Sequence, residues 1–179
     1  MVMKADTSFN IKIFLMKTLI NFWPPYLGTG IWVREISPDY HYIKVEMKMR
    51  FWNKNIVGTH FGGSLYAMAD PFYMVMLIKI LGKQYIVWDK SAKINFIRPG
   101  KGYLFAEFMF DKNQIETIKE ITKEKGKYQP RYTLTIKDTS GKPVAEVEKE
   151  LYIRKKRSDF RHQKCTPMRP KIRPLQKHR

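Results

Sequence analysis

The stretch that decides the fold is Asn55-Ile-Val-Gly-Thr-His-Phe-Gly-Gly-Ser-Leu-Tyr-Ala-Met-Ala-Asp-Pro-Phe-Tyr-Met-Val-Met-Leu-Ile-Lys-Ile-Leu81. It opens with a glycine-bearing loop and continues as an apolar segment in which Asp70 is the only charged residue before Lys79. Apolar residues recur at helical spacing on every side of this segment, which is typical of an enclosed helix. Its longest clean apolar run, Phe72 to Ile78, is shorter than the roughly 18 residues that a membrane crossing needs. The sequence therefore predicts one long internal helix.

Two consecutive glycines, Gly62 and Gly63, stand just before the predicted helix start at Ser64. The first amides of a helix have no partner within the helix, and glycine leaves them unshielded. Such amides can donate hydrogen bonds to an oxygen that gains negative charge during a reaction. The glycine pair is therefore a candidate oxyanion site.

Asp70 precedes Pro71 and has two interpretations. In the first, Asp70 is the N-cap of a helix that begins at Pro71, where proline is favoured. In the second, the helix begins at Ser64 and Pro71 kinks it, because proline removes the backbone bond to the Ala67 carbonyl. Asp70 would then lie on a distorted turn among apolar side chains, which suits a carboxylate to proton transfer.

The rest of the chain is expected to form one domain, residues 1–153, followed by a basic tail, residues 154–179. The whole chain has 179 residues, 44% of them hydrophobic, and a formal net charge of +18, and a chain of this length can bury one sizeable core. The tail holds 11 Lys/Arg and one acid. It is either a disordered solubilising extension or a segment that contacts nucleic acid or an anionic membrane through charge. Because Cys165 is the only cysteine, no internal disulfide is possible, and a reducing, cytoplasmic compartment is expected.

Two further helices are predicted, one before the strands and one inserted between two of them. Apolar residues at helical spacing predict an N-terminal helix over residues 9–23, which Pro24-Pro25 end. The sequence Asp111-Lys-Asn-Gln114 resembles a capping box and predicts a short surface helix that ends at Gly126.

Alternating apolar and polar residues predict strands over residues 29–37, 41–50, 85–97, 103–110, 132–136 and 145–153. This order favours the α+β class, with an antiparallel sheet curled round the central helix. The edge of such a sheet favours pairing with a second copy. Lys149 interrupts the apolar side of the last strand. It either extends from an edge strand towards water or faces a polar cavity.

The register of Asn55, Gly58, Gly62, Gly63 and Asp70 resembles that of the hotdog-fold thioesterase superfamily, in particular its phenylacetate-pathway type. Phe61 stands where those thioesterases have histidine, and His60 is one position away. The chain is more similar to an uncharacterised, thioesterase-like branch of the superfamily. That similarity is carried by Asn21-Phe-Trp-Pro-Pro25, Gly58-Thr-His-Phe-Gly-Gly-Ser-Leu-Tyr66, Tyr85-Ile-Val-Trp-Asp-Lys90 and Phe96-Ile-Arg-Pro-Gly100.

The resemblance implies a hotdog fold, in which a curved antiparallel sheet wraps one long helix, and hydrolysis of acyl-CoA or a related acyl thioester. It implies that the Asp70 carboxylate activates water or attacks the thioester, that the Gly63 amide polarises the carbonyl, and that Asn55 completes the catalytic set. The residues expected to line the substrate site are Gly62, Phe61, His60, Ser64 and Arg98. Arg98 either meets the phosphates of a CoA-like ligand or is a solvated charge at a strand end. No cofactor is expected, and no metal, because the histidines lack metal-ligand spacing.

Seven residues separate Gly63 from Asp70, which corresponds to roughly 10 Å along a helix. Both groups must approach one carbonyl to about 3 Å, so the site is expected to be shared between two subunits of a dimer or tetramer. The departure at Phe61 keeps a second function open, in which a hotdog protein binds an acyl or other apolar ligand without hydrolysing it.

Overall fold

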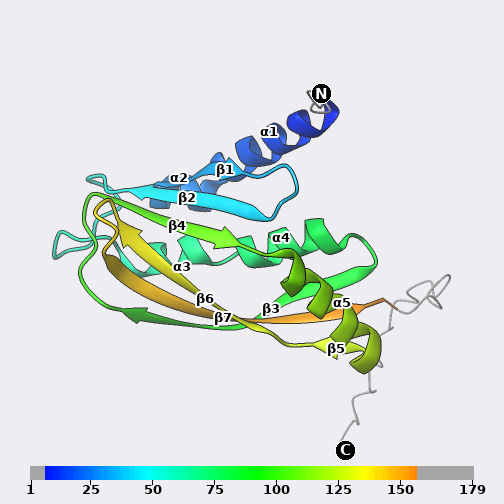
Figure 1. Cartoon of the computed structure of the whole chain (residues 1–179). Coiled ribbons are helices and arrows are strands. Elements are labelled where there is room, and N and C mark those ends of the chain that lie inside the picture. The colour runs from blue at the N-terminus through cyan, green and yellow to red at the C-terminus, as the bar shows by residue number, and fades with distance from the viewer. Residues whose placement is uncertain (1–6, 157–179) are drawn as a thin grey trace, which may run out of the picture.

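The computed structural model describes residues 7–156 (Figure 1). The helices are α1 (Thr7–Asn21), α2 (Pro24–Thr29), α3 (Gly62–Ala69), α4 (Phe72–Leu81) and α5 (Lys112–Lys125). The strands are β1 (Ile31–Ile36), β2 (Tyr42–Lys48), β3 (Tyr85–Phe96), β4 (Tyr103–Met109), β5 (Lys127–Tyr128), β6 (Arg131–Asp138) and β7 (Pro143–Lys155). The residues from 157 onward, which include Cys165 and most of the predicted basic tail, lie outside the described residues.

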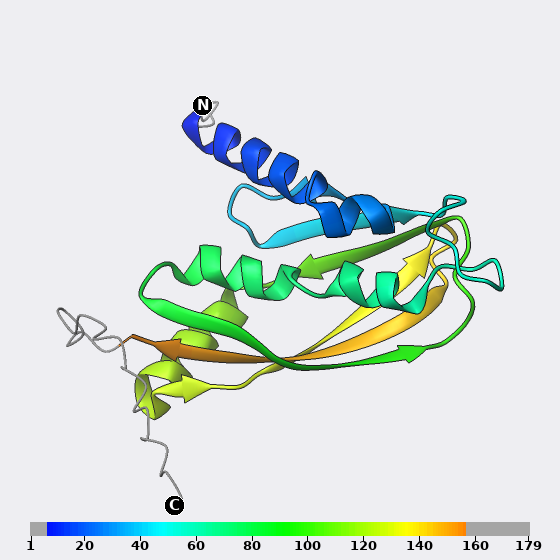
Figure 2. The same cartoon turned by 180° about the vertical axis from the view of Figure 1, so that it is seen from behind.

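Within this part of the chain the strands form one antiparallel sheet in the order β1-β2-β4-β6-β7-β3, and β5 pairs with the end of β7. The sheet curves round α3 and α4, which run across its inner face (Figures 1 and 2). The predicted α+β architecture with a curved antiparallel sheet is therefore confirmed. Strands β1 and β3 lie at the edges of the sheet, whereas β7 lies inside it between β6 and β3.

The central helix consists of α3 and α4, which Asp70 and Pro71 separate. By length and composition alone, Gly62–Leu81 could cross a membrane. However, Met68, Phe72 and Met76 are fully buried against the sheet. This burial identifies the segment as the core helix of the fold.

The backbone at Asp70 decides between its two interpretations. Asp70 has helical dihedral angles, φ −65° and ψ −62°, and ends α3, so the N-cap interpretation is wrong. The helix begins at Gly62, two residues before the predicted Ser64. Pro71 cannot donate to the Ala67 carbonyl, which instead accepts a hydrogen bond of 3.3 Å from the Tyr26 hydroxyl. The break in the helix is thus stabilised from α2.

The predicted helix over 9–23 is α1, which ends at Asn21, and a second helix that the sequence analysis did not predict, α2, follows it. The side chain of Asn21, the last residue of α1, donates to the Val33 carbonyl at 3.2 Å and accepts from the Val33 amide at 2.6 Å. These bonds tie the end of α1 to β1. Pro24 and Pro25 then begin α2, because proline fits the first helical positions, where no amide donor is needed.

The predicted strands and the surface helix are present. Asp111 and Gln114 form the predicted capping box of α5 through reciprocal bonds of 2.7 and 2.9 Å. Strand β7 continues to Lys155, two residues beyond the predicted domain boundary at 153. Its inner side carries Ala145, Val147, Leu151 and Ile153, all buried in the core, together with Lys149.

Candidate functional site

A buried lysine links the central helix to the sheet. Lys149 Nζ lies 2.8 Å from Asp70 Oδ1 and 3.3 Å from Asp89 Oδ1, and the Lys149 side chain is only 1% exposed. The predicted extension of Lys149 from an edge strand is therefore wrong, because β7 is an inner strand and the side chain points towards the helix. The alternative holds, in which Lys149 faces a polar site.

The carboxylates of this cluster differ in exposure. Asp70 is 47% exposed and Asp89 24% exposed, so the expectation that Asp70 is enclosed by apolar side chains is wrong. Burial and the nearby Asp70 raise the pKa of Asp89, although Lys149 opposes them. Tyr66 precedes Asp70 by about one helical turn, and its ring lies 5.8 Å from Lys149 Nζ. Burial, together with the Asp70 and Asp89 carboxylates, also raises the pKa of Tyr66, against the effect of Lys149.

The glycine pair forms the first turn of α3, where Phe61 is the N-cap residue. The Phe61 ring covers Gly63 so closely that an added Cβ would lie 2.4 Å from a ring carbon. The Phe96 ring packs on Gly62 in the same way, at 3.0 Å. The amides of Ser64 and Leu65 both donate to the Phe61 carbonyl, and Ser64 is buried. Of the hydrogen bonds found within residues 7–156, none is donated by the Gly62 or Gly63 amide.

Asn55 organises the loop that leads to this helix start. Its Oδ1 accepts from the Val57 and Thr59 amides at 3.1 and 3.0 Å, and its Nδ2 donates to Thr59 Oγ1 at 2.8 Å. The Asn55 side chain is thus engaged within its own loop. Through these bonds Asn55 fixes the shape of the loop that leads to Phe61.

His60 is buried beneath the same loop. Its Nε2 donates to the Gly102 carbonyl at 3.0 Å, because a carbonyl oxygen only accepts. Burial lowers the pKa of His60, although the bond to Gly102 opposes this shift. The backbone amide of His60 donates to the Gly100 carbonyl at 2.9 Å. His60 therefore holds the loop over residues 100–102, while its neighbour Phe61 is 58% exposed.

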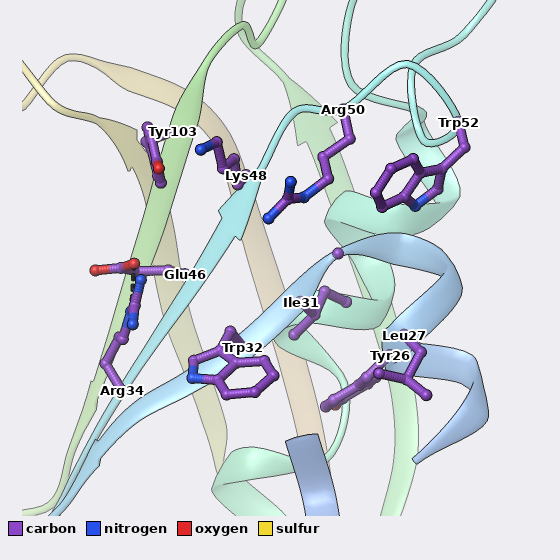
Figure 3. Close-up of a pocket in the computed structure, with 11 residues that line it drawn as sticks. Tyr26, Leu27, Ile31, Trp32, Arg34, Glu46, Lys48, Arg50, Trp52 and Tyr103 are labelled. Carbon is purple, nitrogen blue, oxygen red and sulfur yellow. Dashed lines mark hydrogen bonds and ion pairs between the residues drawn. The ribbon is translucent and has the colours of Figure 1, made fainter. Parts of the chain in front are cut away.

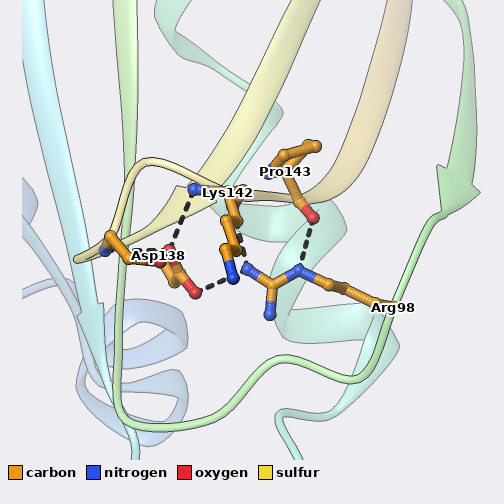
Figure 4. A network of polar contacts seen from close by, with 5 residues as sticks. Arg98, Asp138, Lys142 and Pro143 are labelled. Carbon is orange, nitrogen blue, oxygen red and sulfur yellow. Dashed lines mark hydrogen bonds and ion pairs between the residues drawn. The ribbon is translucent and has the colours of Figure 1, made fainter.

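Arg98 is held by the turn between β6 and β7 (Figure 4). Its guanidinium pairs with the Asp138 carboxylate and donates to the carbonyls of Pro143 at 2.8 Å and Lys142 at 3.0 Å. Hydrogen bonds from Ser140 and Arg98 hold the pKa of Asp138 well below its usual range. In this arrangement Arg98 is neither a freely solvated charge nor directed towards Asp70.

A second pocket, of about 570 Å³, lies over β1, β2 and β4 (Figure 3). Arg34 pairs there with Glu46 at 2.6 Å. The Arg50 guanidinium lies 5.3 Å from the Trp52 ring. None of the predicted site residues lines this pocket. The lining consists of Tyr26, Leu27, Gly30, Ile31, Trp32, Arg34, Glu46, Lys48, Arg50, Trp52 and Tyr103.

The predicted site residues thus fall into three places. Asp70 lies with Lys149 and Asp89 beside the sheet, the glycine pair lies with Phe61 at the start of α3, and Arg98 lies at the β6–β7 turn. Among the described residues, no group of three or more His, Cys, Asp or Glu side chains could hold a metal ion. The sequence-based reasoning did not select Asp89 or Tyr66. The sequence signal that could have found the cluster was Lys149, a charged residue on the apolar side of a strand.

Comparison with known protein families decides the family. The model of a domain of unknown function, DUF4442, matches residues 12–153. The chain belongs to this family. No curated protein matches the chain.

Several solved structures resemble this DUF4442 chain. A probable thioesterase of unknown function from Pseudomonas aeruginosa has a TM-score of 0.71 and 22% identity, covering 80% of this chain and 96% of its own. A thioesterase from Haemophilus influenzae has a TM-score of 0.57 and 14% identity, with coverages of 85% and 93%. The Escherichia coli PaaI protein from the phenylacetic acid degradation operon has a TM-score of 0.53 and 16% identity, with coverages of 75% and 87%. The chain therefore has the hotdog fold of these thioesterase-family structures, and its own family, DUF4442, is one of unknown function.

Proposed function

We propose that this DUF4442 protein is a thioesterase that hydrolyses acyl-CoA or a related acyl thioester. The observation that carries the proposal is the half-exposed Asp70 carboxylate at the end of α3, which the buried Lys149 of β7 holds at 2.8 Å. The first turn of the same helix presents the Gly62 and Gly63 amides, which donate no hydrogen bond within the described residues. A fixed carboxylate can act as general base towards a water molecule, and the amides at a helix N-terminus can stabilise the oxyanion that forms when a thioester is attacked.

In the proposed reaction, Asp70 accepts a proton from a water molecule, whose oxygen attacks the thioester carbonyl carbon. The Gly63 amide donates a hydrogen bond to the carbonyl oxygen as this oxygen gains negative charge. The carbon–sulfur bond then breaks, the acyl group leaves as a carboxylic acid, and the thiolate takes up the proton. Lys149 positions Asp70 and does not touch the substrate.

The proposed active form is a homodimer, or a tetramer built from dimers. Asp70 and Gly63 lie at opposite ends of α3, roughly 10 Å apart, so one subunit alone does not bring both to one carbonyl. The edge strand β3 and exposed apolar side chains such as Phe96 and Ile97 offer a surface for a second copy. A stable monomer in light scattering at micromolar concentration, with full hydrolytic activity, would remove this part of the proposal.

The proposed substrate carries a hydrocarbon acyl group. An apolar groove of about 370 Å³ lies beside the break between α3 and α4. One of its lining residues, Pro71, directly follows Asp70 in the sequence. Apolar grooves of this kind suit an alkyl or aryl chain. The groove is lined by Leu19, Ile20, Trp23, Tyr26, Pro71, Phe72 and Val75. We place the protein in the cytoplasm, where a lone cysteine, Cys165, stays reduced.

The test is a panel of acyl-CoA esters of different chain lengths, with release of free thiol followed by absorbance. Asp70→Asn keeps the size of the side chain but removes the proton acceptor, so the rate should fall on the order of 10²- to 10⁴-fold. Glu148→Gln is the matched control, because Glu148 is an exposed carboxylate next to Lys149 in β7, and it should leave the rate unchanged. A folded Asp70→Asn protein that hydrolyses its best ester at the wild-type rate would contradict the proposed mechanism.

A second candidate function is binding of an acyl ligand without hydrolysis. The observation that favours it is the Phe61 ring, which covers Gly63 where the thioesterases that this chain resembles have histidine. Binding of acyl-CoA in calorimetry, without thiol release from any ester, would select this function instead.

A further inference from the structure

A cationic pocket is lined by residues of α5, β5 and the end of β7. These three elements meet at one end of the sheet (Figure 1). Its volume is about 390 Å³. Among the described residues, its lining contains no acid and six basic residues, namely Lys123, Lys125, Lys127, Arg154, Lys155 and Lys156. Thr122, Gly126 and Tyr152 complete the lining. The charge of this pocket is therefore uncompensated by its own walls.

The strands place like charges directly opposite one another in this pocket. Lys127 on β5 is the cross-strand partner of Arg154 on β7, and like charges in such positions destabilise a sheet. Arg154 Nε is also buried without a hydrogen-bond partner within the described chain. Glu150, the last acid of β7, is engaged by Lys90 at 2.6 Å and Arg131 at 3.4 Å. An anion bound in the pocket would relieve the repulsion and supply the missing partner.

Two aromatic side chains continue this face of the sheet. Tyr152 lies two residues before Arg154 on β7 and therefore points to the same side. Trp88 on β3 is the cross-strand partner of Tyr152 and is 68% exposed. Tyr152 is half-buried, so Trp88 is the exposed ring beside the cations, and unpaired bases stack on such rings while their phosphates meet the cations.

We propose that this cationic pocket, together with Trp88 and Tyr152, binds single-stranded nucleic acid. A bilayer is a poor partner, because a flat lipid surface reaches only the rim of a concave site, whereas a phosphate chain can enter it. The charge also continues along the chain, because residues 157–179 add eight Lys/Arg and a single acid, Asp159. This length of positive charge matches a polymer of phosphates better than a small phosphorylated ligand.

The experiment measures fluorescence anisotropy of a labelled single-stranded oligonucleotide with the full chain across a range of salt concentrations. The double variant Lys123→Gln/Lys127→Gln removes two exposed cations from the pocket. The affinity should fall at least tenfold at low salt. The slope of log affinity against log salt should decrease by about 1.4, since each phosphate contact to a single strand contributes about 0.7.

The matched control is Lys48→Gln/Arg50→Gln, which removes two exposed cations from the separate pocket over β1 and β2. It should leave both the affinity and the salt slope unchanged. Trp88→Ala tests stacking: it should lower the affinity roughly tenfold while leaving the salt slope unchanged, because the ring contributes no charge. The circular dichroism spectra and melting temperatures of all variants establish that they fold.

Four outcomes would overturn the inference. Equal loss of binding in the pocket variant and the control would indicate attraction by net charge alone. Unchanged binding in the pocket variant would assign any binding to residues 157–179. Displacement of the oligonucleotide by stoichiometric CoA would assign the pocket to a small phosphorylated ligand. Stronger binding to phosphatidylcholine–phosphatidylserine vesicles, with Trp88→Ala silent towards the oligonucleotide, would assign it to a membrane.

Discussion

Lys149 and Asp70 form an ion pair whose two members are unequally exposed: the lysine is buried in the sheet, whereas nearly half of the carboxylate side chain reaches solvent. The partners are 79 residues apart in the sequence and 2.8 Å apart in space. The ammonium therefore depends on its carboxylates for compensation, while the carboxylates retain access to water. Substitutions on the two sides of the pair should have unequal effects.

Removing the lysine should cost less than removing the acids. In Lys149→Met the buried charge is replaced by an apolar chain of similar length, and we expect a loss of less than about 2 kcal/mol in the free energy of unfolding. In Asp70→Ala/Asp89→Ala the ammonium stays buried without a carboxylate, and the expected loss is about 3 kcal/mol or more. Urea unfolding at pH 7 measures both values. A larger loss of unfolding free energy for Lys149→Met than for Asp70→Ala/Asp89→Ala would contradict the view that the buried ammonium depends on the two carboxylates.

His60 should make stability depend on pH. Its pKa in the folded protein is lowered from 6.5, so below that pH the unfolded chain binds a proton that the folded chain does not. Stability is then fully present above pH 6.5 and declines as the pH falls, by up to about 1.4 kcal/mol per pH unit. His60→Gln removes this titration and can still donate to Gly102. Urea unfolding between pH 7.5 and 5.5 should show a flatter profile for the variant, and an equally steep profile would argue against a neutral, buried His60.

Arg98 should matter for the β6–β7 turn and not for substrate affinity. In Arg98→Gln the pairing with Asp138 and the bonds to two turn carbonyls are weakened, so the amides of residues 139–142 should exchange hydrogen faster. The KM for acyl-CoA should stay unchanged, because the guanidinium is already engaged. Hydrogen exchange and steady-state kinetics check the two halves, and a large increase in KM would return Arg98 to the role of a phosphate ligand.

Phe61→His should raise the rate of thioester hydrolysis. The side chain at this position lies at the N-cap of α3 and over Gly63, so an imidazole there can donate a hydrogen bond near the carbonyl that the Gly63 amide would polarise. Phe61→Leu, which is apolar and offers no donor, is the control. Thiol release from the best ester of the panel measures the change, and equal rates in the two variants would show that the donor is not limiting.

Local patterns predicted most of the elements. The all-round apolarity of residues 62–81 identified the core helix, and the Asp111–Gln114 spacing identified the capped surface helix. These signals are local, because helical periodicity and capping depend on residues a few positions apart. The missed detail was local as well, since Pro24 and Pro25 could equally end one helix or begin the next.

The sequence by itself determined the core helix, the strands and the register from Asn55 to Asp70 that resembles hotdog thioesterases. Only the tertiary structure decided that β7 lies between β6 and β3, which turns Lys149 from an edge residue into the buried partner of Asp70. It likewise decided that Arg98 is engaged by Asp138, 40 positions away. The physical reason is that burial and ion pairing depend on strand order and on distant segments of the chain, whereas residue spacing along one segment reports only the periodicity of that segment.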